Sequence, residues 1–365
     1  MDGVIFGSVI AARILVPLAI PRFPLPAMLV ALVIDGIDQT IFQTFTSLDL
    51  AGYQNYDKAL DVYYLSIAYT ATLRNWTHHT AVAVGRFLYY FRLVGVVIFE
   101  VTQIRAVLLI FPNTFEYFFD FYEAVRARWD PRRMTQGLVV GAAAFIWIFI
   151  KLPQEWWIHV AQLDFTDFLA DHAWAGPTIV VLLLVAFGVF WIWGRPRLLP
   201  ADHTWRFRAD PLPEPVATAS QQGREYAEYG AVWSMNTLEK VVLLGLLSVI
   251  FGQTLPGFDG SNLQLFVGVA VVVVINAVFS LAMARRARTV ESTALAFLAR
   301  MVGNVALVVV AAWLLPRGDD ISVGATLFFL TMISLLTTLH DRWYSVMEGR
   351  VAASEEGTGV APVTS

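Results

Sequence analysis

The chain has 365 residues, of which 57% are hydrophobic and only 15% are charged, and its mean hydropathy is +0.61. Soluble domains carry about 25% charged residues, so this composition excludes an ordinary soluble protein and predicts an all-α, polytopic bundle of transmembrane helices. The sequence has no basic patch that would suggest nucleic-acid binding. It also has no cysteine, which excludes disulfides, thiolate catalysis and zinc–thiolate sites.

Apolar runs of membrane-spanning length recur along the chain, separated by turns that contain proline, glycine or charge. The first run is not preceded by basic residues, so we interpret it as a retained helix rather than a cleaved signal peptide. The expected helices cover residues 4–20, 26–45, 57–74, 84–111, 135–151, 176–194, 232–252, 262–283, 292–315 and 321–339. This interpretation gives ten spans.

The stretch from residue 84 to residue 122 allows a second interpretation. A shorter helix could turn near residues 100–105 and pair with another span that ends near residue 122, which gives eleven spans in total. Glu116, Asp120 and Glu123 follow i, i+4, i+7 spacing, so the second half of this stretch is amphipathic. We therefore expect one long helix over 84–111, followed by an interfacial or broken helix.

The helices divide the chain into four regions. Residues 1–194 form a polar-rich N-terminal bundle, 195–230 a proline-rich linker, 231–345 a C-terminal four-helix bundle, and 346–365 a disordered tail. Arginines concentrate in alternate loops, and the positive-inside rule places those loops and the C-terminus in the cytoplasm. The N-terminus is then cytoplasmic with ten spans and external with eleven. Only three of the 25 basic residues are lysines, which is typical of GC-rich bacterial genomes and suggests a bacterial inner (plasma) membrane.

Ionisable residues within apolar helices are the candidate functional residues, because a charge at the bilayer centre costs about 2.5–3.5 kcal/mol. The expected ion or substrate pathway consists of Asp35, Asp38, Arg86, Arg92, Glu100 and Arg105. The secondary candidates are Asp57, Asp61, Glu116 and Asp120. Asp57 and Asp61 open an expected helix, where hydration at the helix end is an equally good explanation. The C-terminal bundle is plainer and is interpreted as scaffold or dimer surface.

Three functions fit this pattern. Without a Walker, HExxH or GxSxG motif, we expect a transporter or permease for an ion or a small polar or anionic solute. One alternative is a membrane enzyme that acts on a phosphorylated or isoprenoid lipid, with arginines on the phosphate. The other is a non-catalytic scaffold or partner subunit. No cofactor is predicted, although converging carboxylates could hold a divalent cation. The expected partners are the lipid bilayer, the ion or solute, and a second copy or another membrane subunit.

Overall fold

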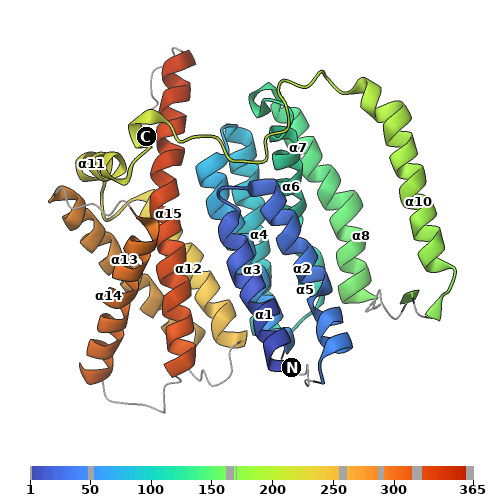
Figure 1. The fold of residues 1–365 in the computed structure, drawn as a ribbon. Coiled ribbons are helices and arrows are strands. Elements are labelled where there is room, and N and C mark those ends of the chain that lie inside the picture. Colours follow the sequence, from blue (N-terminus) through green and yellow to red (C-terminus); the bar gives the residue numbers. More distant parts are fainter. Residues whose placement is uncertain are drawn as a thin grey trace.

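The computed structural model describes residues 2–47, 53–161, 168–169, 171–254, 261–286, 292–314 and 323–358, and these form helices without a strand (Figure 1). The N-terminal half contains α1 (Asp2–Leu15), η1 (Val16–Ala19), α2 (Pro24–Phe45), α3 (Tyr53–Asn75), α4 (His79–Thr102), α5 (Ala106–Ile110), α6 (Thr114–Arg126), η2 (Pro131–Arg133), α7 (Gln136–Phe145), η3 (Ile146–Lys151), α8 (Leu152–Glu155), η4 (Trp156–Val160), α10 (Ala175–Val189) and η5 (Phe190–Gly194). The remainder contains η6 (Arg195–Arg197), η7 (Glu214–Val216), α11 (Ala219–Tyr229), α12 (Met235–Thr254), α13 (Asn262–Arg285), α14 (Thr293–Leu314) and α15 (Val323–Thr358).

The architecture confirms the prediction of an all-α membrane bundle. Within the described ranges, seven helical segments are long and apolar enough to cross a membrane. The segments α7, η3, α8 and η4 follow one another without a break from residue 136 to residue 160 and act as one of these seven. The protein is therefore a polytopic helical bundle that fits a multi-pass membrane protein.

Helix α3 lies at the centre of the N-terminal bundle, although it is more polar than its neighbours. Nearly all of its residues between Ala59 and Leu73 are buried, and it packs against α1, α2, α4, α12 and α15. Ser66, Thr70 and Thr72 donate their hydroxyls to backbone carbonyls of α3 itself. Because these polar atoms are satisfied within the helix, α3 can be enclosed by other helices without unpaired hydroxyls.

The stretch from residue 84 to residue 122 folds as the alternative interpretation described, and the expected single helix over 84–111 is wrong. Helix α4 ends at Thr102, and Gln103 adopts a left-handed conformation with a φ of 56° that stops the helix. The chain then returns through α5 and α6. A Cβ atom at Gly95 would lie 2.1 Å from Cβ of Phe111, so glycine is what allows the returning chain to contact α4.

Helix α6 lies inside the bundle and not at a membrane surface. Both its aromatic face and its acidic face are buried, and it packs against α2, α4, α7 and η3. The rings of Phe115, Phe118, Phe119 and Tyr122 are fully buried, as is the carboxylate of Glu123. A short, polar helix of this kind is stabilised by neighbouring helices and not by its own hydropathy.

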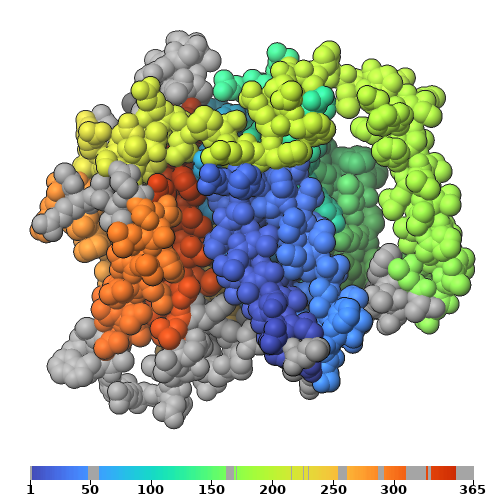
Figure 2. Space-filling view, in the orientation of Figure 1, coloured from blue at the N-terminus to red at the C-terminus, as the bar shows by residue number. Residues whose placement is uncertain are grey.

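The arginine-rich loops lie at one end of the bundle, here called the arginine-rich end. The linker crosses this end as the yellow-green segment in Figure 2. Ala209 donates its backbone N–H to Arg22 O at 2.8 Å, and Arg206 donates to Ala127 O at 3.0 Å. Asp2 lies at the opposite end, where its carboxylate accepts from Ser47. The linker is therefore held against the bundle by backbone hydrogen bonds.

When α5 and α6 are counted as one segment, and the elements from α7 to η4 as another, the described chain runs between the two ends eleven times. Helices α1 and α15 therefore point the same way.

Three expected boundaries differ from those in the structure. Helix α3 begins at Tyr53, within the expected loop 46–56, of which residues 48–52 lie outside the described ranges. Lys151, expected near a loop, is buried within the continuous segment 136–160. Helix α15 continues to Thr358, whereas a disordered tail was expected from residue 346, and residues 359–365 lie outside the described ranges.

Candidate functional site

Four aspartates from two helices surround one arginine from a third helix. Arg13 of α1 donates from Nη1 to Asp38 and Asp57, and from Nη2 to Asp35 and Asp61. The distance from Arg13 Nη2 to Asp61 Oδ1 is 2.6 Å. This aspartate–Arg13 cluster brings together the two pairs of carboxylates that the sequence placed on α2 and α3.

Helix geometry explains why these side chains meet. Asp35 and Asp38 are three residues apart on α2, and Asp57 and Asp61 are four apart on α3, so each pair shares one face of its helix. Helices α2 and α3 run in opposite directions and both contact α1. Long side chains on a helix point towards its N-terminus, so the guanidinium of Arg13 is directed away from the arginine-rich end.

Burial within the cluster is uneven. The side chains of Arg13 and Asp38 are each only 3% exposed, whereas those of Asp57 and Asp61 are 38% and 39% exposed. We expected Asp57 and Asp61 to be hydrated at a helix end. They are partly exposed there, but they also bond to the buried Arg13. The cluster therefore extends from a buried arginine and aspartate to two partly exposed aspartates.

The charges in the cluster do not balance. Four carboxylates bond to one guanidinium among the residues that the structure describes, so the acids outnumber the base at these contacts. Carboxylate oxygens of Asp35, Asp57 and Asp61 lie within 4.8 Å of one another, which is compatible with a bound metal ion. Hard cations bind such oxygen ligands, and protons can occupy the same carboxylates. The arrangement is thus suited to cation or proton uptake.

The other residues of the expected pathway lie elsewhere. Arg86 contacts Glu239 at 3.5 Å, and Glu100 contacts Lys58 at 3.4 Å. Arg92 donates from Nη1 to the carbonyl of Phe111 at 3.0 Å, which holds α5 against α4. These contacts join neighbouring helices, and Glu239 also accepts from Tyr69 and contacts His340 at 3.5 Å. They do not form one continuous pathway with the aspartate–Arg13 cluster.

Arg105 and the secondary candidates on α6 also occupy separate places. Arg105 is exposed in the turn between α4 and α5. Glu116 accepts hydrogen bonds from Tyr64 OH at 2.6 Å and from Asn113 Nδ2 at 2.8 Å. Asp120 lies on the same helix, and its Oδ1 atom is buried without a hydrogen-bond partner. Of the ten predicted site residues, only the four aspartates come together.

Sequence reasoning missed Arg13, which is the centre of the cluster. Its signal was present, because a lone arginine within the first apolar run needs a partner in the membrane. The partner could not be identified without knowing how α1 packs against α2 and α3.

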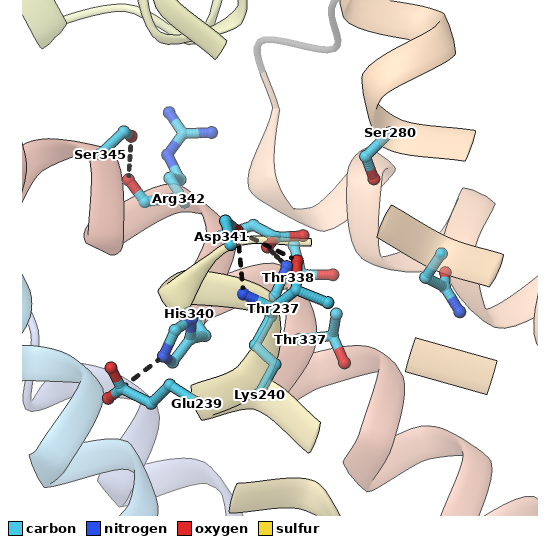
Figure 3. Close-up of polar contacts among 12 residues, drawn as sticks. Thr237, Glu239, Lys240, Ser280, Thr337, Thr338, His340, Asp341, Arg342 and Ser345 are labelled. Carbon is cyan, nitrogen blue, oxygen red and sulfur yellow. Dashed lines mark hydrogen bonds and ion pairs between the residues drawn. The ribbon is translucent and has the colours of Figure 1, made fainter. Parts of the chain in front are cut away.

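A second charged centre was also missed, in the C-terminal half (Figure 3). Asp341 of α15 accepts from Lys240 of α12 and from Arg300 Nη2 of α14, the latter at 2.7 Å. Arg300 also donates to Ser280 Oγ and Thr338 Oγ1, both at 3.1 Å. A cavity of about 1100 Å³ adjoins this centre and is lined by α11, α13, α14, α15 and the start of α12. The C-terminal half, which we interpreted from the sequence as scaffold or dimer surface, therefore also contains a charged centre beside a cavity.

Comparison of the chain with protein-family models, with curated proteins and with solved structures found no match. Function must therefore be inferred from the geometry of the chain itself.

Proposed function

We propose that the protein is an ion-coupled membrane transporter that binds a proton or a small metal cation at the aspartate–Arg13 cluster. The observation that supports this function is the charge imbalance, in which four carboxylates share one guanidinium. Charges of one sign that are partly removed from water need counterions. Following the positive-inside rule, the proposal places the arginine-rich end in the cytoplasm of a bacterial inner membrane.

The balance of charges elsewhere argues against a purely structural role for the cluster. Lys58 contacts Glu100 at 3.4 Å, and Arg126 contacts both Glu123 at 2.5 Å and Asp210 at 3.6 Å, so at most two acids face one base at these contacts. The aspartate–Arg13 cluster differs because four acids bond to one base, and such an excess of carboxylates is the property that a cation site requires.

The position of the large cavity favours transport over lipid chemistry. A lipid-modifying enzyme needs a groove for its apolar substrate beside the metal-binding carboxylates. The cavity of about 1100 Å³ is lined only by residues from Ala219 onwards and includes none of the four aspartates. This cavity therefore offers no lipid site to a cation bound at the cluster.

Ion flux through the purified chain tests the proposal. The protein is reconstituted into liposomes that contain a fluorescent indicator for H⁺, Na⁺ or Mg²⁺, and a gradient of each ion is imposed in turn. Wild-type protein is compared with Asp35→Asn, which removes one ionisable group from the cluster. Asp2→Asn is the matched control, because Asp2 undergoes the same chemical change at the end of the bundle, outside the cluster.

We expect wild-type vesicles to dissipate at least one of the three gradients faster than protein-free vesicles. Asp35→Asn should slow that flux by about tenfold, which corresponds to losing roughly 1.4 kcal/mol of ion binding. Asp2→Asn should retain the wild-type rate. Flux no faster than in protein-free vesicles for all three ions would contradict the proposal, as would equal rates for wild type and Asp35→Asn.

A further inference from the structure

The cavity in the C-terminal half has the dimensions of a site for a lipid-sized molecule. Small-molecule pockets typically enclose about 300–1,000 Å³, and this cavity reaches about 1100 Å³. It lies where α13, which packs on α12, faces α14, which packs on α15. Phe279 lines the cavity and is 64% exposed, so the cavity opens towards the outer surface of these helices.

The cavity extends from the arginine-rich end towards the middle of the bundle. Along α14, Arg300 lies about 10 Å from the start of the helix at Thr293, and Leu307 lies about 21 Å from it, at a rise of about 1.5 Å per residue. Both residues line the cavity. The lining residues of α14 extend from Ala296 to Leu307, about 17 Å at the same rise, which is similar to the thickness of about 15 Å for half of a bilayer's hydrocarbon core.

Polar and apolar groups separate along this axis. Gln222, Tyr226 and Ser234 line the cavity near the arginine-rich end, whereas Ile275 and Leu307 line its deep part. Burial raises the pKa of Tyr226 to about 12, so its hydroxyl is a hydrogen-bond donor at neutral pH. A molecule that fits both parts has a polar head and an apolar tail.

The charge at the polar part favours an anionic head. The charged lining residues are two arginines and two acids, namely Arg300, Arg342, Asp341 and Glu348. Lys240, which is buried behind Asp341, and Arg300 both bond to Asp341, so positive charge is in excess at this point of the lining. The buried Oδ1 atom of Asn236, which also lines the cavity, accepts no hydrogen bond within the described chain. A head that carries hydroxyl groups would supply the missing donor.

From this charge, shape and depth we infer that the cavity binds an anionic, hydroxyl-bearing membrane lipid. Its head lies beside Arg300 and Asn236, and its acyl chain passes between α13 and α14. This site is separate from the aspartate–Arg13 cluster and does not depend on the proposed transport.

Two variants test the two parts of the site. Arg300→Gln removes the charge beside the head. Gly303→Phe fills the path of the chain, because Gly303 lines the cavity and has no atom within 4 Å of an added Cβ. The matched controls are Arg286→Gln, at the end of α13, and Gly268→Phe, also on α13 with open space around it, and neither residue lines the cavity.

The full chain is purified in detergent and titrated with dioctanoyl-phosphatidylglycerol, dioctanoyl-phosphatidylcholine or glycerol 3-phosphate. The apparent Kd is taken from the rise in Tm, and native mass spectrometry counts the bound molecules. We expect phosphatidylglycerol to bind with about tenfold higher affinity than either other probe, the size of effect expected from one buried charged contact. Arg300→Gln and Gly303→Phe should each weaken this binding by about tenfold, while both controls retain it.

Equal binding of the two lipids would overturn the inference, because the head would then not be recognised by its charge. Glycerol 3-phosphate binding as tightly as phosphatidylglycerol would identify a site for a free anion without an apolar part, which also overturns it. If Arg300→Gln does not fold, Gly303→Phe still decides the question. Unchanged lipid binding in Gly303→Phe would show that the lipid does not bind in this cavity. If Gly303→Phe dissociates a homodimer without loss of lipid, the cavity is occupied by a second copy of the chain.

Discussion

Replacement of Arg13 by glutamine is the sharpest test of the aspartate–Arg13 cluster. The variant keeps a polar side chain, although a shorter one, and removes the guanidinium that bonds to all four aspartates. The four carboxylates then face one another without their shared base. We expect the folded protein to lose stability, and to lose more of it as the pH rises.

The expected loss follows from the burial of the cluster. Removing one partner of a buried ion pair typically costs about 3–5 kcal/mol. Arg13 and Asp38 are buried, but Asp57 and Asp61 are more than a third exposed, so water screens part of the repulsion. We therefore expect the low end of that range, about 3 kcal/mol, which corresponds to a fall in Tm of about 4 °C for a chain of 365 residues.

The pH dependence distinguishes electrostatic repulsion from a simple packing defect. Without the guanidinium, mutual repulsion opposes ionisation of the carboxylates in the folded variant but not in the unfolded chain, so the folded variant binds more protons. Stability falls with rising pH wherever the folded state binds more protons than the unfolded state. The gap in Tm between wild type and Arg13→Gln should accordingly widen from pH 5 to pH 8.

Thermal unfolding of the protein in nanodiscs, followed by intrinsic fluorescence, measures this gap. Arg13→Lys should fall between wild type and Arg13→Gln, because lysine keeps the charge but not the planar fork that reaches several carboxylates. Arg105→Gln is the control, since Arg105 is exposed in the α4–α5 turn. A loss in Arg13→Gln no larger than in Arg105→Gln, or a gap that does not change with pH, would refute the reasoning.

Two further predictions concern the fold. Because the chain has no cysteine, single cysteine substitutions can be labelled with a membrane-impermeant maleimide. Ser47→Cys and Arg105→Cys should react from one side of the membrane. Arg132→Cys and Thr204→Cys should react from the other side. Labelling of Arg105→Cys and Arg132→Cys from the same side would contradict the return of the chain through α5 and α6. Gly95→Ala should destabilise the protein by about 1–3 kcal/mol, because its Cβ would overlap Phe111. Gly137→Ala, which has open space around it, should leave Tm unchanged, and an equally small effect at Gly95 would refute the close contact.

The sequence predicted where the helices lie along the chain better than it predicted which helices pack against one another. Long apolar runs identify membrane helices because the bilayer demands internal backbone hydrogen bonds over a fixed thickness, and α2, α12 and α13 lie close to their expected ranges. The turn at Gln103 was only the second of two interpretations, because a left-handed glutamine has no strong sequence signal. The close contact between Gly95 and Phe111, which the returning chain makes with α4, also has no signal in the sequence.

The candidate site was predicted in part for the same reason. Helical spacing placed Asp35 with Asp38 and Asp57 with Asp61, because residues three or four apart share a face. Whether the two faces meet depends on the packing of three helices, which spacing within one helix cannot determine. Asp341 was overlooked because it lies near the end of an apolar run, where a charge needs no special explanation, yet it is the acid shared by Lys240 and Arg300.

The two charged centres differ in stoichiometry, and this difference argues for different ligands. At the aspartate–Arg13 cluster four acids bond to one base among the described residues, and the cation that we propose there is small enough to fit among carboxylates. At Asp341 two bases bond to one acid, and the neighbouring cavity is large, so the lipid that we propose there is anionic and amphiphilic. Burying charge costs desolvation energy, and a bound ion or head group of the opposite sign would offset that cost. The opposite excess of charge at the two centres is thus the reason why the two proposals name different ligands.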